Sequence, residues 1–533
     1  MTNERTADSD DAPGSPPGAA PDEAPDDAPD DGRDDASDAL FAAVYEGRED
    51  TVVTLLRSGV TAEATDQDGQ SALYAAAVSD EPGAVRLLLA AGADPERSSG
   101  PGDGDLPLCG AACGGHTEVV LALLAAGALP DRREAYGFTA LAWAVGQGHA
   151  ATVEALLAHG ADPDLPGPGG GVPDGEPPLV TAARRGSPST VRALLRHGAG
   201  AREEALAEAR RWTAPEAVEH ELHAELLPMA GEGDETVVRR IEEDGGVTVV
   251  VETLRDGVPV ASLERQTGHG AITTVLEESL GLPAPFEELA GRALRCGVPE
   301  RDDWREPVAA LWRRGDEESF QASLAWLASD DPLRRAFAAD VLAGLGMADG
   351  ERPFADRALP PLRESCARAR TPELIGACVT ALGAQGDSAV LPEILRHTGH
   401  PDPGVRRRVT AALAGLVAGD HEEGIAALTA LSADIDNPVR ERATTALAAA
   451  DADTPGIREA LAARLTDPVA VTAAEAARGL AAREDPRAVD ALARMLADGR
   501  VAGHARETAA AAVSGLPDAA VRRRLEGLLP RGR

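Results

Sequence analysis

The chain has 533 residues, which is too long for one hydrophobic core and predicts several domains or a repeat array. Its 89 acidic residues outnumber 51 basic ones, all arginine, and give a formal net charge of −38. This charge opposes binding to nucleic acid phosphates and anionic membranes and favours basic partners. The absence of lysine excludes a P-loop, a kinase-type nucleotide clamp and a pyridoxal Schiff base, because each requires an ammonium side chain.

The composition also indicates the kind of core and the compartment. Aromatic residues supply only 3% of a chain that is 43% hydrophobic, so the core is expected to consist mainly of Ala, Leu and Val in closely stacked helices. Five cysteines without a paired CxxC favour a reducing compartment. The first ten residues lack the apolar core of a signal peptide, and no run is apolar enough to cross a membrane. We therefore expect a cytoplasmic protein, and the lysine-free, Ala/Arg-rich usage is typical of a high-GC bacterium.

Residues 1–37 form the first predicted segment. They hold 12 acidic residues against Arg5 and Arg33, in a background of Asp, Ala, Pro, Gly and Ser. Such a segment cannot bury enough apolar surface to offset its ordering entropy, so a disordered acidic tail is expected. It would serve as a solubilising tail or as an acidic docking arm.

A repeat of turn, short helix, glycine break and second helix begins at Asp38. Its closing glycines are separated by 33, 35, 33 and 38 residues, and they are Gly59, Gly92, Gly127, Gly160 and Gly198. The pattern resembles ankyrin repeats over residues 38–200, with a first, capping repeat that lacks the preceding hairpin turn. The family's TPLH tetrapeptide is degraded in all four full repeats, for example to SALY at residues 71–74. This resemblance therefore puts in doubt the inter-repeat hydrogen bonds that the family's histidine makes.

Residues 201–300 interrupt the period and are expected to form a small α+β connector. The runs at 247–254 and 258–263 flank Asp256-Gly257, which predicts a β-hairpin with a type I′ turn. Pro259 would confine the second strand to a sheet edge. The alternative is a fifth, eroded repeat that carries an insertion.

A second, longer repeat occupies residues 301–533. Its first helices begin at Asp-Pro or a near equivalent, with prolines at positions 332, 372, 403, 438 and 468. The pattern resembles HEAT repeats, particularly the short bacterial kind also found in phycobilin lyases. The resemblance implies an inter-repeat arginine ladder through Arg334, Arg406 and Arg440 that Ala470 interrupts. The fold class is therefore mainly α, an α-solenoid of ankyrin and then HEAT-like repeats joined by the connector.

The sequence contains no residue set that points to catalysis. Cys109 and Cys113 stand at i and i+4 without a second pair nearby, and packing between repeats explains them better than a metal. The dipeptides His220-Glu221 and His421-Glu422 resemble single pieces of iron-binding motifs of HEAT-type hydroxylases, but the histidines do not recur as a set. We expect no enzymatic activity, no cofactor and no metal.

Repeat arrays present long surfaces that contact a partner at many points, so the predicted function is a protein–protein interaction scaffold or adaptor. The partner would be a protein, preferably basic, on the concave surface of the solenoid; the oligomeric state stays open. One alternative is a HEAT-type lyase or lyase chaperone for a tetrapyrrole or a modified protein. The other is nucleic-acid binding by the C-terminal array, which is disfavoured because residues 331–533 hold 26 arginines against 28 acidic residues.

In ankyrin proteins the partner lies against the hairpin tips and the inner helices. The residues at the matching positions are Asp68, Gln70, Ser79, Asp103, Asp105, Tyr136, Phe138, Gln147, Glu176, Arg184 and Arg185. Tyr136 and Phe138 are two aromatic residues on one turn of an aromatic-poor chain. They are expected either to anchor a partner or to pack on the enlarged loop at 167–176.

Overall fold

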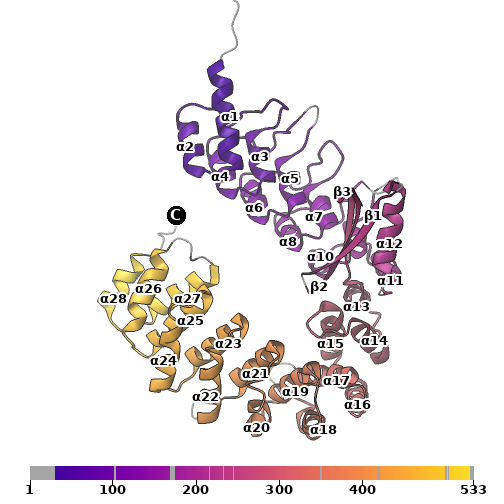
Figure 1. Ribbon diagram of the computed structural model, residues 1–533, viewed down its shortest axis with the longest axis vertical. Coiled ribbons are helices and arrows are strands. Elements are labelled where there is room, and N and C mark those ends of the chain that lie inside the picture. Colours follow the sequence, from indigo (N-terminus) through magenta and orange to yellow (C-terminus); the bar gives the residue numbers. More distant parts are fainter. Residues whose placement is uncertain are drawn as a thin grey trace, which may run out of the picture. The chain divides into compact units, whose positions relative to one another are not determined.

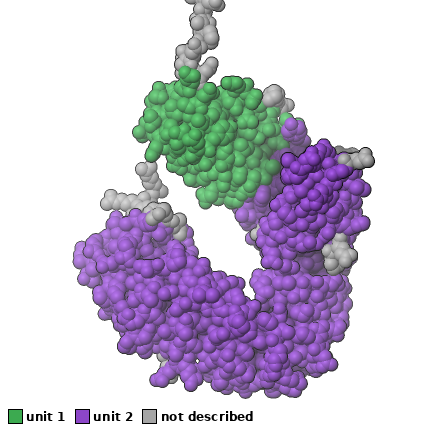
Figure 2. All heavy atoms as spheres, in the orientation of Figure 1, with its two compact units in different colours: residues 1–135 green, residues 136–533 purple. Residues whose placement is uncertain are grey.

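The computed structural model describes residues 31–100, 104–168, 175–214, 217–231, 233–243, 245–347, 351–417, 421–498, 501 and 503–528. The chain divides into two compact units, residues 1–135 and 136–533 (Figure 2). Both units are helical, and the second also contains a small antiparallel sheet (Figure 1). Most of the predicted tail lies outside the described residues, and the first helix begins at Asp31, inside the segment predicted as tail.

The first unit consists of three helix pairs. They are α1 (Asp31–Tyr45) with α2 (Glu49–Arg57), α3 (Ala72–Val78) with α4 (Pro82–Ala90), and α5 (Pro107–Gly114) with α6 (Thr117–Ala125). Each pair packs on the next, first helix on first helix and second on second, as α1 on α3 and α4 on α6. Fully buried leucines on successive first helices, Leu40, Leu73 and Leu108, form the core between them.

The second unit begins with two further ankyrin pairs. They are α7 (Ala140–Gln147) with α8 (Ala150–Ala158) and α9 (Pro178–Arg185) with α10 (Pro188–Arg196). Helix α11 (Arg202–Arg211) packs on α9, and α13 (His269–Ser279) packs on both α11 and α10. The two helices therefore continue the ankyrin stack as a further pair, interrupted by an insertion of α12 (Ala217–Leu226), a short 3₁₀ turn at Leu227–Met229, and three strands.

The strands are β1 (Glu235–Glu243), β2 (Gly246–Arg255) and β3 (Val258–Gln266), paired antiparallel in that order. The predicted hairpin is confirmed: Asp256 and Gly257 have φ of 51° and 80°, as a type I′ turn requires, and β3 with Pro259 lies at an edge. Strand β1 was not predicted. One face of the sheet packs on α12, where Val249 and Val251 meet Val218 and Leu222.

The HEAT-like part runs from α14 to α28. Its helices are α14 (Phe286–Cys296), α15 (Asp302–Arg314), α16 (Glu317–Leu327), α17 (Pro332–Gly344), α18 (Ala355–Ala367), α19 (Pro372–Ala384), α20 (Leu391–Leu395), α21 (Pro403–Leu416), α22 (Glu422–Leu431), α23 (Asn437–Ala449), α24 (Pro455–Arg464), α25 (Ala470–Ala482), α26 (Arg487–Ala497), α27 (Gly503–Ser514) and α28 (Ala519–Glu526). The odd-numbered helices from α15 to α27 pack on one another in series. Trp304, Phe320 and Phe337 fill the core at the start of this series, and further along it the core contains mainly leucine and alanine.

The expected helix starts are formed as predicted at Asp331, Thr371 and Asp402, whereas Asp436 replaces Asn437 as the cap of α23 and the helix expected from Asp467 begins only at Ala470. The Oδ1 of Asp402 accepts the N–H of Val405 at 3.0 Å, and the Oδ1 of Asp436 accepts that of Val439 at 3.2 Å. Each cap precedes a proline in the first turn, where no amide hydrogen is needed.

The arginine ladder forms at two of the three predicted positions. Arg406 bonds to both carboxylate oxygens of Asp434 at 2.7 and 2.8 Å, and Arg440 bonds to those of Asp467 at 2.8 and 3.1 Å. Both arginines are buried and also donate back to carbonyls before their own helix, such as His400 for Arg406. The ladder therefore joins successive repeats through bidentate ion pairs.

The prediction for Arg334 was wrong by one position. Its guanidinium lies over the ring of Trp326, 5.0 Å from the centroid, outside the ladder. Arg335 instead reaches the following helix α18 and donates to the carbonyl of Ser365 at 2.7 Å. The fourth residue after the helix cap faces the next repeat, and in α17 that residue is Arg335.

Candidate protein-interaction surfaces

The first unit exposes a row of side chains on its first helices. Tyr45, Val78 and Cys113 each stand two residues before a residue with positive φ that ends the turn after the helix. Because α1, α3 and α5 pack in series, these equivalent positions lie along one face, and we call the three residues the first-helix stripe. Tyr45 is 53% exposed, Val78 is 37% exposed and Cys113 is half-buried.

Two side chains of the stripe, Tyr45 and Val78, pack closely against neighbouring residues. The ring of Tyr45 lies 6.5 Å from that of the buried Phe41. Val78 lies against α5, where a Cβ on Gly110 would come within 2.7 Å of the Val78 Cγ1. The side chains are therefore exposed on a rigid scaffold. Sequence reasoning missed Tyr45 because it treated the first repeat as a cap, although the spacing from Tyr45 to Gly47 matches that from Val78 to Asp80.

The first unit is strongly acidic. Residues 38–135 contain 16 acidic residues against 6 arginines. At the hairpin tip, the Oδ1 of Asp66 accepts the N–H groups of Asp68 and Gln70 at 3.0 and 2.8 Å, so Asp66 holds the turn and Asp68 is exposed. This excess of acidic residues gives the unit a negative net charge.

The second hairpin is fixed by a tyrosine in place of the family's histidine. The Tyr74 hydroxyl lies 3.2 Å from the Oδ2 of Asp105, in the next repeat. Burial, and then the charge of Asp105, raise the pKa of Tyr74. Asp105 therefore ties two repeats together as well as lining the hairpin. Gln70 and Ser79 are half-buried, and Asp103 lies outside the described residues.

In the second unit, the predicted aromatic pair is divided between two environments. Tyr136 is 72% exposed. Phe138 is half-buried and stacks on Trp143 of α7, with ring centroids 4.4 Å apart and planes at 27°. Phe138 therefore packs on its own repeat, while Tyr136 points to solvent. Gln147, at the end of α7, is half-buried.

The three predicted residues at α9 are paired within the chain. Arg184 bonds to Glu176 at 2.8 Å and to Glu208 of α11 at 2.9 Å. Arg185 is only 9% exposed and donates to the carbonyl of Glu264 in β3 at 2.6 Å. The expectation of an open side chain therefore does not hold for Arg185, because the inserted sheet covers this part of the ankyrin surface.

Glycine at position 186 permits this contact between the sheet and α9. Its φ is +79°, and a Cβ there would lie 2.1 Å from the carbonyl oxygen of Gln266. The carbonyl of Gly186 accepts the N–H of Gly268 at 3.1 Å. The insertion is thus docked by backbone contacts that exclude any side chain at this position.

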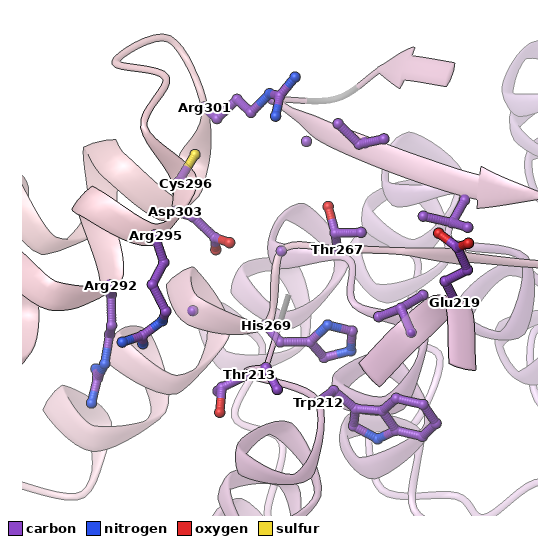
Figure 3. Close-up of a pocket in the computed structure, with 18 of the residues that line it drawn as sticks. Trp212, Thr213, Glu219, Thr267, His269, Arg292, Arg295, Cys296, Arg301 and Asp303 are labelled. Atoms are coloured by element: carbon purple, nitrogen blue, oxygen red, sulfur yellow. The ribbon is translucent and has the colours of Figure 1, made fainter. Parts of the chain in front are cut away.

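A cavity of about 220 Å³ lies where the sheet, α12, α13 and α14 meet (Figure 3). Trp212 and His269 form one wall and stack with centroids 5.9 Å apart. The His269 Nε2 lies 3.2 Å from the carbonyl of Arg184, and burial lowers the pKa of this histidine to about 4. Asp303 accepts the N–H of Ala271 at 2.6 Å, and burial raises the pKa of Asp303 to about 6.

The cavity does not assemble an activated nucleophile. Its one thiol, Cys296, donates to the carbonyl of Val298 at 3.7 Å, and burial raises the pKa of Cys296. A protonated thiol is a poor nucleophile, and the hydrogen bond partner of His269 is a backbone carbonyl. Within the described ranges, no three His, Cys, Asp or Glu side chains are placed to share a metal ion. Among the helices that the structure describes, none has the length and apolarity to cross a bilayer.

Comparison with known proteins finds both repeat types. Family models for ankyrin repeats (3 copies) match residues 23–99 and 96–167, and a model for HEAT repeats matches residues 359–448. None of the curated proteins matches the chain. The chain is therefore an α-solenoid protein, and it contains ankyrin repeats followed by HEAT repeats. Both repeat types generally form surfaces for protein–protein interaction, typically without catalytic activity.

Proposed function

We propose that this scaffold binds a basic protein segment on residues 31–135, with apolar side chains of the partner seated on the first-helix stripe. The observation that carries the proposal is the exposure of Tyr45 and Val78 at equivalent positions on stacked helices, within a strongly acidic unit.

Each part of this surface has a separate role in binding. A rigidly supported tyrosine supplies a large contact area with little conformational entropy to lose, which is the usual property of an interface hot spot. The carboxylates of this acidic unit accelerate association with a basic partner and reject acidic ones. The stripe is thus expected to determine the dissociation rate and the carboxylates the association rate.

Hairpin residues are further candidate contacts, proposed for each unit by itself. In the first unit these are Asp68, Gln70, Ser79, Asp103 and Asp105, and in the second unit Tyr136, Phe138 and Gln147. Glu176 and Arg184 join them only at the edge, since they already pair within the chain, and Arg185 is left out because β3 covers it. The inserted sheet would mark the end of the available ankyrin surface.

The test begins with a partner captured by the immobilised chain from its host and identified by mass spectrometry, whose affinity is then measured by calorimetry. Tyr45→Ala with Val78→Ala is expected to weaken binding by about 2 kcal/mol, as the loss of central anchors does. The matched control is Leu121→Ala with Leu129→Ala, because both leucines are exposed in the same unit but lie outside the stripe.

Two results would contradict the proposal. One is a stripe variant that binds as tightly as the control variant, with an unchanged melting curve. The other is a partner whose contacting segment is acidic. Visible absorbance that copurifies with the chain would favour the lyase alternative over a scaffold.

A further inference from the structure

We propose that the HEAT array has a second binding site, a groove for an acidic peptide segment of a protein. The groove has a volume of about 550 Å³ and is lined by Glu300, Arg305 of α15, and residues of α19, α21 and α23. It lies entirely within residues 136–533, so this proposal does not depend on the one made for the ankyrin repeats.

Two arginines in the groove have no partner among the described residues. Arg305 and Arg442 are exposed, and neither guanidinium forms a hydrogen bond or ion pair with any residue that the structure describes. Other arginines of this array, such as Arg406 and Arg440, have a carboxylate partner instead. Unpaired guanidinium groups in a groove can each bind a carboxylate by two parallel hydrogen bonds.

The other two arginines of the groove are held in place by carboxylates. Arg407 bonds to Asp436 at 2.9 and 2.6 Å. Arg408 crosses α19 to reach Asp340 of α17 at 3.0 Å. It can cross because position 376 is glycine: a Cβ there would lie 2.8 Å from the Arg408 Cδ. The pairs fix the floor of the groove and leave Arg305 and Arg442 as the groups available to a ligand.

The mixture of charges favours a peptide over a nucleic acid. Glu300, Glu373 and Asp402 line the same groove. A nucleic acid presents closely spaced phosphates that would lie against these carboxylates as well as against the arginines. A peptide carries carboxylates at intervals, with neutral residues and amide hydrogens between them, so it can match the arginines and donate hydrogen bonds to the acids.

Fluorescence anisotropy with the full chain tests the proposal. The probes are a labelled peptide of alternating Asp and Ser, a neutral peptide of alternating Asn and Ser, and a labelled DNA duplex. We expect the acidic peptide to bind, the neutral peptide not to bind, and added salt to weaken binding. Arg305→Gln with Arg442→Gln should raise the Kd at least about tenfold, because two charge-assisted contacts are lost.

The matched control is Arg494→Gln with Arg524→Gln. These residues are also exposed and unpaired among the described residues, lie in the same array, and change the net charge equally, but they are outside the groove. Neither pair has a hydrogen bond or ion pair to a described residue to lose, so melting curves should match the wild type. Absence of acidic-peptide binding, equal loss in both double variants, or equal binding of the neutral peptide would overturn the proposal. If DNA binds more tightly than the acidic peptide and the groove variant loses this binding, the ligand of the groove is a nucleic acid and not a peptide.

The two binding proposals can also be separated. Tyr45→Ala with Val78→Ala should leave the affinity for the acidic peptide unchanged, and the groove variant should leave the affinity for a basic partner unchanged.

Discussion

The ankyrin and HEAT repeats of this chain both use ion pairs between neighbouring repeats, but at different depths. In the ankyrin unit, Glu63 accepts from Arg97 and Glu96 accepts from Arg132, and these side chains are 21–39% exposed. In the HEAT array, Arg406, Asp434, Arg440 and Asp467 are at most 11% exposed. An exposed ion pair contributes little to the free energy of unfolding, because water and salt screen it. A buried pair is costly to break, because the loss of one partner leaves the other charge buried and unpaired.

The largest expected effect comes from breaking the buried ladder. Arg440→Ala should lower the free energy of unfolding by about 3 kcal/mol, because the buried Asp467 loses its bidentate partner and keeps only the longer contact with Arg464 at 3.6 Å. Urea denaturation followed by far-UV circular dichroism measures this, since all tryptophans lie between residues 143 and 326. Arg442→Ala on the same helix is the control and should change the value by less than about 0.5 kcal/mol. Equal effects of the two substitutions would show that the ladder does not stabilise the array.

An intermediate effect is expected at the junction cavity, as a dependence on pH. His269 has a lowered pKa, so the unfolded state binds its proton more readily and stability falls as the pH drops from about 6.5 to 4. Asp303 has a raised pKa, so the folded state binds its proton more readily and stability rises as the pH drops from about 6 to 4. The two contributions oppose each other.

The substitution Asp303→Asn removes the contribution of Asp303 to this pH dependence. The variant should lose about 2 kcal/mol more than the wild type between pH 7 and pH 4.5. Tryptophan fluorescence reports on this region because Trp212 stacks on His269. Parallel curves for the variant and the wild type would contradict the assignment, and adding His269→Gln to the variant should flatten its curve.

The smallest effect is expected from the exposed ankyrin pair. Arg97→Ala removes the ion pair with Glu63 and a donation to the Glu63 carbonyl at 2.9 Å, and should cost less than about 1 kcal/mol. Hydrogen exchange of the amides at 94–100 measures it, because residues 1–135 contain no tryptophan. Arg86→Ala, whose nearest carboxylate is 3.8 Å away, is the control. A loss as large as that of Arg440→Ala would show that exposure does not explain the contrast.

Local signals in the sequence predicted much of the fold. Glycine spacing located the ankyrin repeats, caps with proline located the HEAT helices, and Asp256-Gly257 located the hairpin. Strand β1 was missed because its residues are mostly exposed on both faces, so its sequence shows no alternation of apolar and polar residues. Arg334 was mistaken for Arg335 because two arginines are adjacent and only the helix start decides which one faces the next repeat.

The candidate site was less predictable, for reasons that are not local. Arg185 has the position of a partner-binding residue, yet an insertion some eighty residues later supplies its acceptor, Glu264, in β3. Tyr45 has no special neighbours in sequence, and its exposure becomes evident only when α1 packs on α3. Sequence periodicity therefore identifies surface positions, while the insertion determines which of them stay open.

The contact of Arg408 with Asp340 has a mechanical consequence. It joins α21 to α17 across α19, so it links two helices that are not neighbours in the stack. A load that straightens this part of the array would stretch this contact as well as the contacts between adjacent helices. One guanidinium group, and the glycine that lets it pass, therefore add a direct link across three repeats to the packing of adjacent helices.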